Sequence, residues 1–253
     1  MKILYFTSTG NCLYIAKRLG GELLSIPQLQ KDGVFEITDD VVGIICPIYG
    51  FNMPHLVRRY LENAIIKAEY IFTVMTFGNR SVAALAQMKK LLGKRGVALH
   101  YSNEIKMVDN YLPGFDITDQ LRIHTDENIE LKINDVVNDI KERKHFLKNH
   151  TRFQKFVSNV FSSLMTKRVM NGMVKNFIVN DLCNGCGTCR KVCPMGNIAG
   201  TEKPEYQNNC EFCLACIHLC PKNAIHLKNE KSEKRFLNQH IKLSEITDAN
   251  KQN

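Results

Sequence analysis

The sequence predicts two folded units: an α/β domain with a doubly wound parallel sheet, followed by a small α+β domain organised by cysteines. Two observations predict this division. Residues 1–150 alternate short apolar runs with helical patterns, whereas eight of the ten cysteines lie within 177–228. Continuous apolar strands joined by helices are typical of a parallel sheet covered on both faces. At 253 residues the chain is long enough for both domains.

The expected elements of the first domain alternate along the chain. We expect strands at 3–6, 41–45, 70–76 and 97–106, and helices at 11–20, 54–67, 80–95 and 126–149. In open α/β sheets, ligands bind beyond the carboxyl ends of the strands. The loops that follow these strands are therefore the candidate binding residues.

The first expected strand ends in a hydroxyl-rich turn that leads into a helix. The turn consists of Thr7, Ser8, Thr9, Gly10, Asn11 and Cys12. Hydroxyls and free N–H groups at a helix N-terminus form a phosphate site, and a glycine lets the backbone approach the anion. The turn has neither GxGxxG nor a Walker lysine, so it is not a dinucleotide fingerprint or a P-loop. Taken alone, the turn is equally compatible with a phosphate site and with the start of an ordinary capped helix.

Two further loops at the same sheet edge carry aromatic residues and glycines. One contains Pro47, Ile48, Tyr49, Gly50, Phe51 and Asn52, and the other contains Thr76, Phe77, Gly78 and Asn79. A flat aromatic, a flexible peptide and fixed turns suit a flavin ring. One phosphate loop and two ring loops together predict a flavin mononucleotide (FMN) site. The alternative for Tyr49 is a partly buried aromatic in a tight turn.

Eight cysteines form two copies of one pattern, C-x2-C-x2-C-x3-C-P. The first copy is Cys183, Cys186, Cys189 and Cys193 before Pro194, and the second is Cys210, Cys213, Cys216 and Cys220 before Pro221. A cubane needs four inward-facing thiolates, and three closely spaced cysteines can wrap three of its corners. Structural zinc usually takes four ligands at wider paired spacing, and nothing marks the chain as a secreted disulfide scaffold. The pattern predicts two [4Fe–4S] clusters.

The duplication extends beyond the cysteines. Val179 and Tyr206 each lie four residues before the first cysteine of their run, and Ile198 and Ile225 lie five residues after the fourth. We therefore expect a pseudo-twofold unit in 177–228, with a short strand entering each half. Such a small unit buries little apolar surface, so metal ligation should supply much of its folding energy.

A basic amphipathic segment at 151–176 separates the two domains, and a tail follows at 229–253. The apolar residues of the segment 151–176 recur at helical spacing: Phe153, Phe156, Val157, Val160, Phe161 and Leu164. The simpler interpretation is a linking helix packed between the domains. The alternatives are a surface for an acidic partner or peripheral contact with an anionic membrane.

The net charge and the cysteine usage bear on partners and compartment. The formal charge of +9 is partly a counterion for anionic cofactors, so we expect no nucleic acid as a partner. No stretch approaches the roughly 18–20 apolar residues of a membrane span, and no secretory signal is evident. Cysteine-rich sequences without such a signal are typical of a reducing compartment, so we expect a cytoplasmic protein.

The motifs carry a resemblance to a known family. Residues 1–150 resemble a flavodoxin domain, and the cysteine runs resemble those of bacterial two-cluster ferredoxins. To about residue 247, the chain resembles the flavodoxin–ferredoxin fusion proteins of anaerobic bacteria and archaea, often called EFR-type ferredoxins. The resemblance rests on 6–11, 47–54, 107–111, both cysteine runs and the tail at 235–240.

The resemblance implies how the cofactors are held. FMN would lie among the three loops together with Asn110 and Tyr111, with Thr7, Thr9 and Asn11 at its phosphate and Tyr49 stacked on its ring. In this pattern the fourth cysteine of each run ligates the other cluster. One cluster would then take Cys183, Cys186, Cys189 and Cys220, and the other Cys210, Cys213, Cys216 and Cys193.

Two positions depart from the family pattern. Ser8 replaces a glycine, and Cys12 replaces the last hydroxyl of the phosphate loop. A thiol is a poor donor to phosphate, so the sequence leaves open whether Cys12 weakens FMN phosphate binding. Cys12 and Cys46 are expected to be small apolar fillers rather than redox thiols.

Two functions are compatible with these features. The leading one is an electron-transfer flavoprotein that exchanges electrons between FMN, the two clusters and redox protein partners. The alternative is an FMN-dependent reductase of a small quinone- or nitro-type substrate, with the clusters as internal wiring. No converging His or Asp pair supports an enzyme, so we assign no catalytic residue. A sensing module would need a DNA-binding element, and none is found in the sequence.

Overall fold

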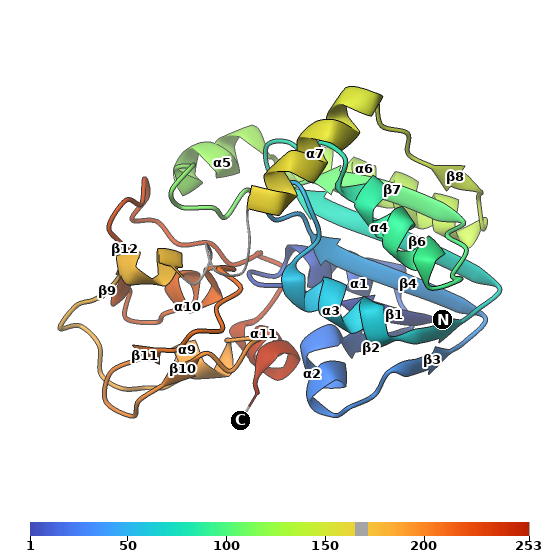
Figure 1. The fold of residues 1–253 in the computed structure, drawn as a ribbon. Helices are drawn as coiled ribbons and strands as arrows, with labels where there is room; N and C mark the ends of the chain where they lie inside the picture. The colour runs from blue at the N-terminus through green and yellow to red at the C-terminus, as the bar shows by residue number, and fades with distance from the viewer. Residues whose placement is uncertain (165–171, 253) are drawn as a thin grey trace.

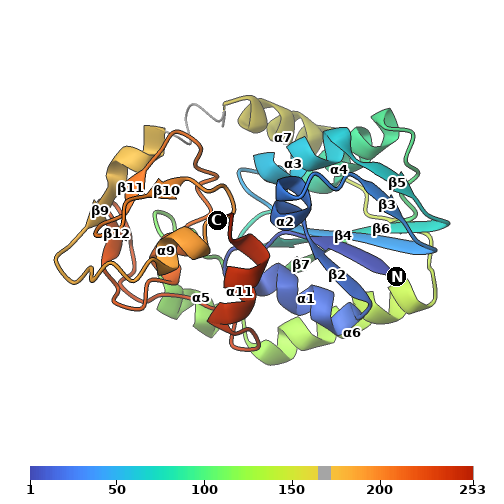
Figure 2. The same cartoon turned by 90° about the horizontal axis from the view of Figure 1, so that it is seen from below.

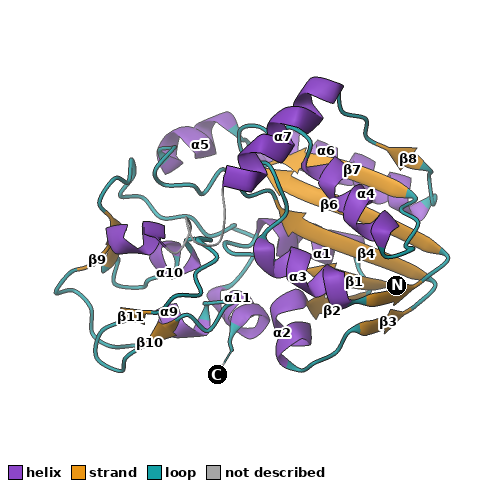
Figure 3. Cartoon of the chain, viewed as in Figure 1, coloured by secondary structure: helices purple, strands orange, loops and turns teal. Residues whose placement is uncertain are grey.

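The structure, a computed structural model, describes residues 1–164 and 172–252. The chain forms two lobes that lie side by side, a larger α/β lobe and a smaller lobe of short elements (Figure 1, Figure 3). The larger lobe contains a six-stranded, all-parallel sheet of order β2-β1-β4-β6-β7-β8. Its strands are β1 (Lys2–Tyr5), β2 (Glu22–Ser25), β4 (Val41–Pro47), β6 (Tyr70–Phe77), β7 (Tyr101–Lys106) and β8 (Phe146–Leu147).

The order of these strands identifies the fold. Numbering the first five sheet strands along the chain gives the order 2-1-3-4-5, which is the flavodoxin-like, doubly wound arrangement. After β1 the chain first adds β2 on one side of it and then adds β4 and the later strands on the other side. The resulting switch point between β1 and β4 is where such sheets bind their ligand. The expected doubly wound α/β fold is therefore confirmed.

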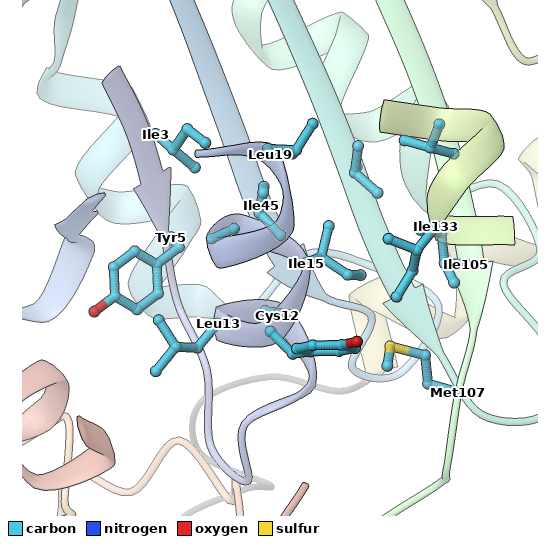
Figure 4. Close-up of a cluster of buried hydrophobic side chains, with 14 of the residues drawn as sticks. Ile3, Tyr5, Cys12, Leu13, Ile15, Leu19, Ile45, Ile105, Met107 and Ile133 are labelled. Carbon is cyan, nitrogen blue, oxygen red and sulfur yellow. The ribbon is translucent and has the colours of Figure 1, made fainter. Parts of the chain in front are cut away.

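Helices cover both faces of the sheet, as Figure 2 shows from below. They are α1 (Asn11–Leu19), α2 (Ile26–Lys31), α3 (His55–Asn63), α4 (Ala84–Lys94) and α6 (Asp126–Lys141). The helix α5 (Ile117–Ile123) lies off the sheet, and its Ile117 packs in the core of the smaller lobe. Alternate residues of β1 serve the two cores: Ile3 and Tyr5 pack with α1 and α6, whereas Leu4 and Phe6 pack with α2, α3 and α4. Figure 4 shows the first of these cores, with α1 lying on the sheet.

Several element boundaries differ from those expected. The helix expected at 54–67 ends at Asn63, and β5 (Ile65–Lys67) pairs in parallel with the unpredicted β3 (Glu36–Thr38). The helix expected at 126–149 ends at Lys141 because Arg143 takes a left-handed φ of 50° and the chain turns into β8. The elements β2, α2 and α5 are too short for periodicity to have found them.

The smaller lobe is built from two interlocked halves. Its elements are η1 (Val174–Asn176), β9 (Phe177–Val179), α9 (Thr188–Lys191), β10 (Ile198–Ala199), β11 (Glu205–Tyr206), α10 (Ala215–His218) and β12 (Ile225–Leu227). Val179 faces Ile225 in the antiparallel β9–β12 pair, and Ile198 faces Tyr206 in the β10–β11 pair. Each half therefore contributes one strand to each ribbon, which gives the pseudo-twofold unit that the duplicated sequence predicts.

The helix α7 (Arg152–Leu164) is not packed between the two lobes as expected. It lies on the larger lobe, where Gln87 of α4 donates to Asn159. Its Phe153, Phe156 and Val160 are 74%, 65% and 43% exposed. The side chains of Phe161 and Leu164 and all of residues 165–171 lie outside the described part of the segment predicted at 151–176.

The tail is an integral part of the fold. It ends in α11 (Leu243–Asn250), which packs against α2 of the larger lobe and α9 of the smaller one (Figure 2). His240 stacks on Tyr14, with ring centroids 4.2 Å apart. The Asn250 side chain donates to the carbonyl of Thr7 at 2.9 Å. The tail thus ties the two lobes together, which its sequence did not predict.

Among the described residues, no helix is both long enough and apolar enough to cross a membrane.

Candidate cofactor sites

A cavity of about 350 Å³ opens at the carboxyl ends of β1, β4, β6 and β7, within the usual size range of small-molecule sites. Every binding residue predicted for FMN lines this cavity except Gly10. They are Thr7, Ser8, Thr9, Asn11, Cys12, Pro47, Ile48, Tyr49, Gly50, Phe51, Asn52, Thr76, Phe77, Gly78, Asn79, Asn110 and Tyr111. Parallel strands bring these four loops to one edge, although they are far apart in sequence.

Gly10 does not line the cavity but packs against the tail. It takes a φ of 102°, and a Cβ there would lie 2.9 Å from the Cβ of Asn238 in the tail. The glycine therefore serves the left-handed start of α1 and the close approach of the tail. The Asn238 N–H donates to the Thr9 carbonyl at 2.8 Å, so the tail braces the turn from behind.

The turn after β1 keeps the features of an anion site. Within the described chain, no side chain caps α1 at Gly10, which leaves the first N–H groups of the helix for a ligand. Asn110 donates to the hydroxyls of Ser8 and Thr9 at 3.0 and 2.9 Å. Thr7 Oγ1 accepts from the Gly10 N–H at 3.1 Å. The side chains thus hold the turn in shape.

Cys12 occupies the wall of the cavity as a neutral thiol. Its Sγ lies 3.2 Å from Thr76 Oγ1, and burial raises the pKa of the Cys12 thiol to about 12. A protonated, buried thiol in contact with a hydroxyl is a packing group rather than a reactive one.

The loop after β4 forms a tight two-residue hairpin. Tyr49 and Asn52 exchange backbone hydrogen bonds, N–H to O, of 2.8 and 3.1 Å. Between them Gly50 and Phe51 have φ values of 54° and 62°, which is the pattern of a type I′ turn. Phe51 is not a glycine, so this turn is held in a costly conformation. The fully buried Ser158 of α7 supports it by donating to the Phe51 carbonyl at 2.7 Å.

Tyr49 lies in the cavity wall between the turn after β1 and Cys213 of the smaller lobe. Its hydroxyl donates to Ser8 Oγ at 3.1 Å, and its ring meets Phe6 edge-on at 6.3 Å. Burial, followed by the nearby Cys213, raises the pKa of Tyr49 well above its ordinary value. The tyrosine therefore lies beside both the turn after β1 and the smaller lobe.

Several residues that line the cavity were not predicted as flavin-binding residues. Asp109 packs against Gly78, where a Cβ would lie 2.1 Å from the Asp109 Cβ, and burial raises the pKa of the Asp109 carboxyl. Its place just beyond β7 is the sequence signal that could have found it. The others are Met53, Pro54, His55, Arg58, Arg80, Val108, Phe115, Glu211, Phe212, Cys213 and Leu214. The last four come from the smaller lobe, which no local signal in the larger one predicts.

The eight cysteines gather around two small cavities. Cys183, Cys186, Cys189 and Cys220 line one, which we call the distal cage. Cys193, Cys210, Cys213 and Cys216 line the other, which we call the proximal cage because Cys213 also lines the large cavity. Each cage takes three cysteines from one run and the fourth from the other. In the described ranges, no group of His, Cys, Asp or Glu could hold a single metal ion.

The donor set of each cage suits a metal cluster. Burial raises the pKa of the Cys213 and Cys216 thiols well above the ordinary value, and that of Cys210 to about 12. Such thiols become thiolates when a metal replaces their protons. Backbone N–H groups of Phe212, Asn197 and Ala224 already point at Cys210, Cys193 and Cys220, with N to Sγ distances of 3.2, 3.3 and 3.3 Å.

The proximal cage is fastened to the larger lobe by hydrogen bonds. His218 of α10 is buried, and burial lowers its pKa to about 4, so the ring is neutral near pH 7. Its Nε2–H donates to the Asn110 carbonyl at 2.7 Å, and its Nδ1 accepts from the Phe236 N–H at 3.1 Å. One histidine thus joins the cage, a loop of the large cavity and the tail.

Comparison with known proteins agrees with the cysteine pattern. The family described as a 4Fe-4S dicluster domain matches residues 182–225. An uncharacterized ferredoxin of Methanocaldococcus jannaschii is 35% identical over 78 residues, which are 27% of this chain and 97% of that protein. One subunit of the ion-translocating oxidoreductase complex of Methanosarcina acetivorans is 44% identical over 48 residues. That match covers 18% of each protein, so the chain spans less than a fifth of this second relative.

Solved structures also resemble part of the chain. A flavodoxin from the domain Archaea matches 57% of this chain and 100% of its own, with 10% identity and a TM-score of 0.32. The Trp repressor binding protein of Bacillus subtilis matches 59% of this chain and 99% of its own, with 10% identity and a TM-score of 0.34. The flavodoxin-like assignment rests on the strand order and not on these matches. With the ferredoxin relative matched over nearly its whole length, the chain belongs to the ferredoxins and is an iron–sulfur electron-transfer protein in which a 4Fe-4S dicluster domain is fused to a flavodoxin-like domain.

Proposed function

We propose that the chain binds one FMN and two [4Fe–4S] clusters and relays electrons between them and redox protein partners. One observation carries this proposal: Cys213 of the proximal cage lines the same cavity as the three predicted flavin loops. A cofactor in that cavity would share a wall with a cluster. Short separation is what intramolecular electron transfer needs from a protein scaffold.

The residues of the cavity would divide the binding of FMN among them. Thr7, Thr9 and Asn11, with the uncapped start of α1, would hold the phosphate. The hairpin at 49–52 and the loop at 76–79 would enclose the ring, with Tyr49 against one face. FMN supplies the exchange of one or two electrons, whereas each cluster exchanges one.

The two cages would hold the two clusters with the fourth cysteines exchanged between the runs. Cys193, Cys210, Cys213 and Cys216 would ligate the proximal cluster, and Cys183, Cys186, Cys189 and Cys220 the distal one. The proximal cluster would exchange electrons with the flavin site. The distal cage has an exposed cysteine, Cys186, so it would exchange electrons with a protein partner. Such clusters and free thiols suit the reducing cytoplasm.

Anaerobic reconstitution followed by single-turnover kinetics tests the proposal. We expect about eight iron, eight sulfide and one FMN per chain. After flavin photoreduction under argon, cluster absorbance should bleach at a rate independent of protein concentration. Four or fewer irons, or no bound FMN, would refute the proposed cofactors. Second-order bleaching would refute the internal relay, and rapid turnover with a quinone or nitro compound would favour the reductase alternative.

A further inference from the structure

Glu211 joins the two lobes at the boundary between the cavity and the proximal cage. It follows Cys210, is 4% exposed and lines the large cavity together with Cys213. Its Oε1 accepts from the His55 N–H at 2.6 Å, and its Oε2 accepts from the Leu56 N–H at 3.1 Å. These are the first two residues of α3, whose preceding residue, Pro54, gives no side-chain cap. A residue of the smaller lobe therefore caps a helix of the larger one.

The duplicated half of the lobe shows that the cage itself does not need this carboxylate. The residue that follows the first cysteine of the other run is Asn184, and it is exposed at the distal cage. Burying a carboxylate is costly unless hydrogen bonds or charges stabilise it. The N-terminus of α3 supplies both, since its N–H groups are unpaired within the helix and carry partial positive charge. An ionised carboxylate suits this place, because it accepts at both oxygens and faces the partial positive charge of the helix N-terminus.

We propose that Glu211 is a positioning residue that couples the flavin site to the proximal cluster. It holds the loop of Cys210 and Cys213 on α3, and it places a fixed negative charge between the two redox sites. This inference rests on the proposed function. A fixed negative charge disfavours reduction of its neighbours, because the reduced forms are more negative. Glu211 therefore lowers the potentials of the proximal cluster and the flavin more than that of the distal cluster.

The test uses the reconstituted full chain with three substitutions of one residue. Glu211→Ala removes the cap, Glu211→Gln keeps the size but removes the charge, and Glu211→Asp keeps the charge. Two quantities are measured: hydrogen exchange at the His55 and Leu56 amides, and midpoint potentials from a titration followed by absorbance and electron paramagnetic resonance. Glu202→Gln is the matched control, because it removes an exposed carboxylate at the rim of the distal cage.

We expect Glu211→Ala to speed amide exchange at least about tenfold, which corresponds to about 1.4 kcal/mol, and Glu211→Asp to restore part of the protection. Glu211→Gln should raise the potentials of the proximal cluster and the flavin, whereas Glu202→Gln should leave these potentials and the α3 amides unchanged. Unchanged exchange in Glu211→Ala, or unchanged potentials in Glu211→Gln, would overturn the proposal.

Two other outcomes remain decisive. If Glu211→Ala does not assemble the proximal cluster, assembly in Glu211→Asp supports the role of the carboxylate, and failure in both overturns it. If the native chain binds no FMN, the proposed function fails. The α3 amides and the cluster potentials still test Glu211 in that case. If FMN binds and bleaching is first-order while all Glu211 variants match the native chain, only this inference fails.

Discussion

The proximal and distal cages share one cysteine spacing but lie in very different surroundings. In the proximal cage Cys193 and Cys216 are each 9% exposed, whereas Cys186 of the distal cage is exposed. The residue four positions before the run that supplies three of the cysteines is Tyr206 for the proximal cage and Val179 for the distal one. The Tyr206 hydroxyl donates to Cys216 Sγ at 3.7 Å, and valine has no such donor.

The duplicated cysteine spacing therefore accounts for the ligands of the two cages, and the fusion to the flavodoxin-like lobe accounts for the difference in their surroundings. The duplicated spacing supplies four inward-facing thiols to each cage. Among the described residues, the flavodoxin-like lobe covers the proximal cage, through contacts such as His218 with Asn110 and Phe212 with Tyr111. Two sites with the same ligand pattern thereby acquire different solvent access and different hydrogen-bond donors, which are the levers that set cluster potentials.

Replacing a single fourth cysteine should have the largest effect, because it should remove one cluster and leave the other. Cys193→Ala should empty the proximal cage, although Cys193 belongs to the first run, and Cys220→Ala should empty the distal cage. Each variant should lose about four of about eight irons, measured by iron analysis and by the remaining paramagnetic signal. If Cys193→Ala instead spared the cluster of Cys210, Cys213 and Cys216, the crossed ligation would be wrong.

Acid should affect the proximal side more than the distal side through His218. Burial lowers its pKa to about 4 in the folded chain, below the ordinary value of about 6.5. The unfolded chain therefore binds more protons between these values, so this contribution to stability is fully present above about pH 6.5 and is lost as the pH falls toward 4. Its full size is on the order of 3 kcal/mol.

Thermal midpoints of the holo-protein under argon, measured between pH 5 and pH 8, would test this linkage. His218→Gln cannot titrate, so its midpoint should be lower at pH 8 but should fall less on acidification. The control is His145→Gln, which changes an exposed histidine beside β8 at the far edge of the sheet. An equal pH dependence in the native chain and in His218→Gln would contradict the assignment.

Loss of Tyr49 should affect the flavin first and the proximal cluster second. Ring stacking is worth roughly 1–3 kcal/mol where it has been measured for bases, so Tyr49→Ala should weaken FMN binding at least several-fold. Tyr49→Phe is the matched control, since it keeps the ring and removes only the bond to Ser8. Fluorescence titration of each flavin-free variant with FMN measures its FMN affinity. Equal FMN affinity in Tyr49→Ala and the native chain would exclude the stacking role.

Much of this arrangement could be predicted from local patterns. Apolar runs such as that of β4 predicted the parallel sheet, and parallel strands end at one edge, so the turn at Thr7 and the hairpin at Tyr49 had to meet there. The cysteine spacing predicted the small lobe because ligand geometry fixes it. The equivalent positions Val179 and Tyr206, four residues before each run, predicted a strand entering each half, and the structure pairs these strands as Val179 with Ile225 and Ile198 with Tyr206.

What the sequence did not predict depends on contacts between distant segments. Glu211 lies in a cluster loop, and only the docked lobes show that it caps α3. Asn238 and Asn250 are ordinary polar residues in a tail, and their hydrogen bonds to the turn of Thr7 and Thr9 have no periodic signal. The exposed apolar face of α7 was assigned to the interface because amphipathicity indicates that a face will be covered, but not which element covers it.

The smallest expected effect would sharpen the contrast between the two cages. Tyr206→Phe removes the hydroxyl that donates to Cys216 Sγ at 3.7 Å but keeps the ring that packs on Phe177. A hydrogen bond to a cluster thiolate stabilises the more negative, reduced form. The proximal potential should therefore fall, by an amount equivalent to about 0.5–1.5 kcal/mol, the usual net contribution of one hydrogen bond. A titration followed by paramagnetic resonance should show this fall with the distal signal unmoved, whereas an equal fall at both clusters would mean that Tyr206 acts through the fold of the whole lobe.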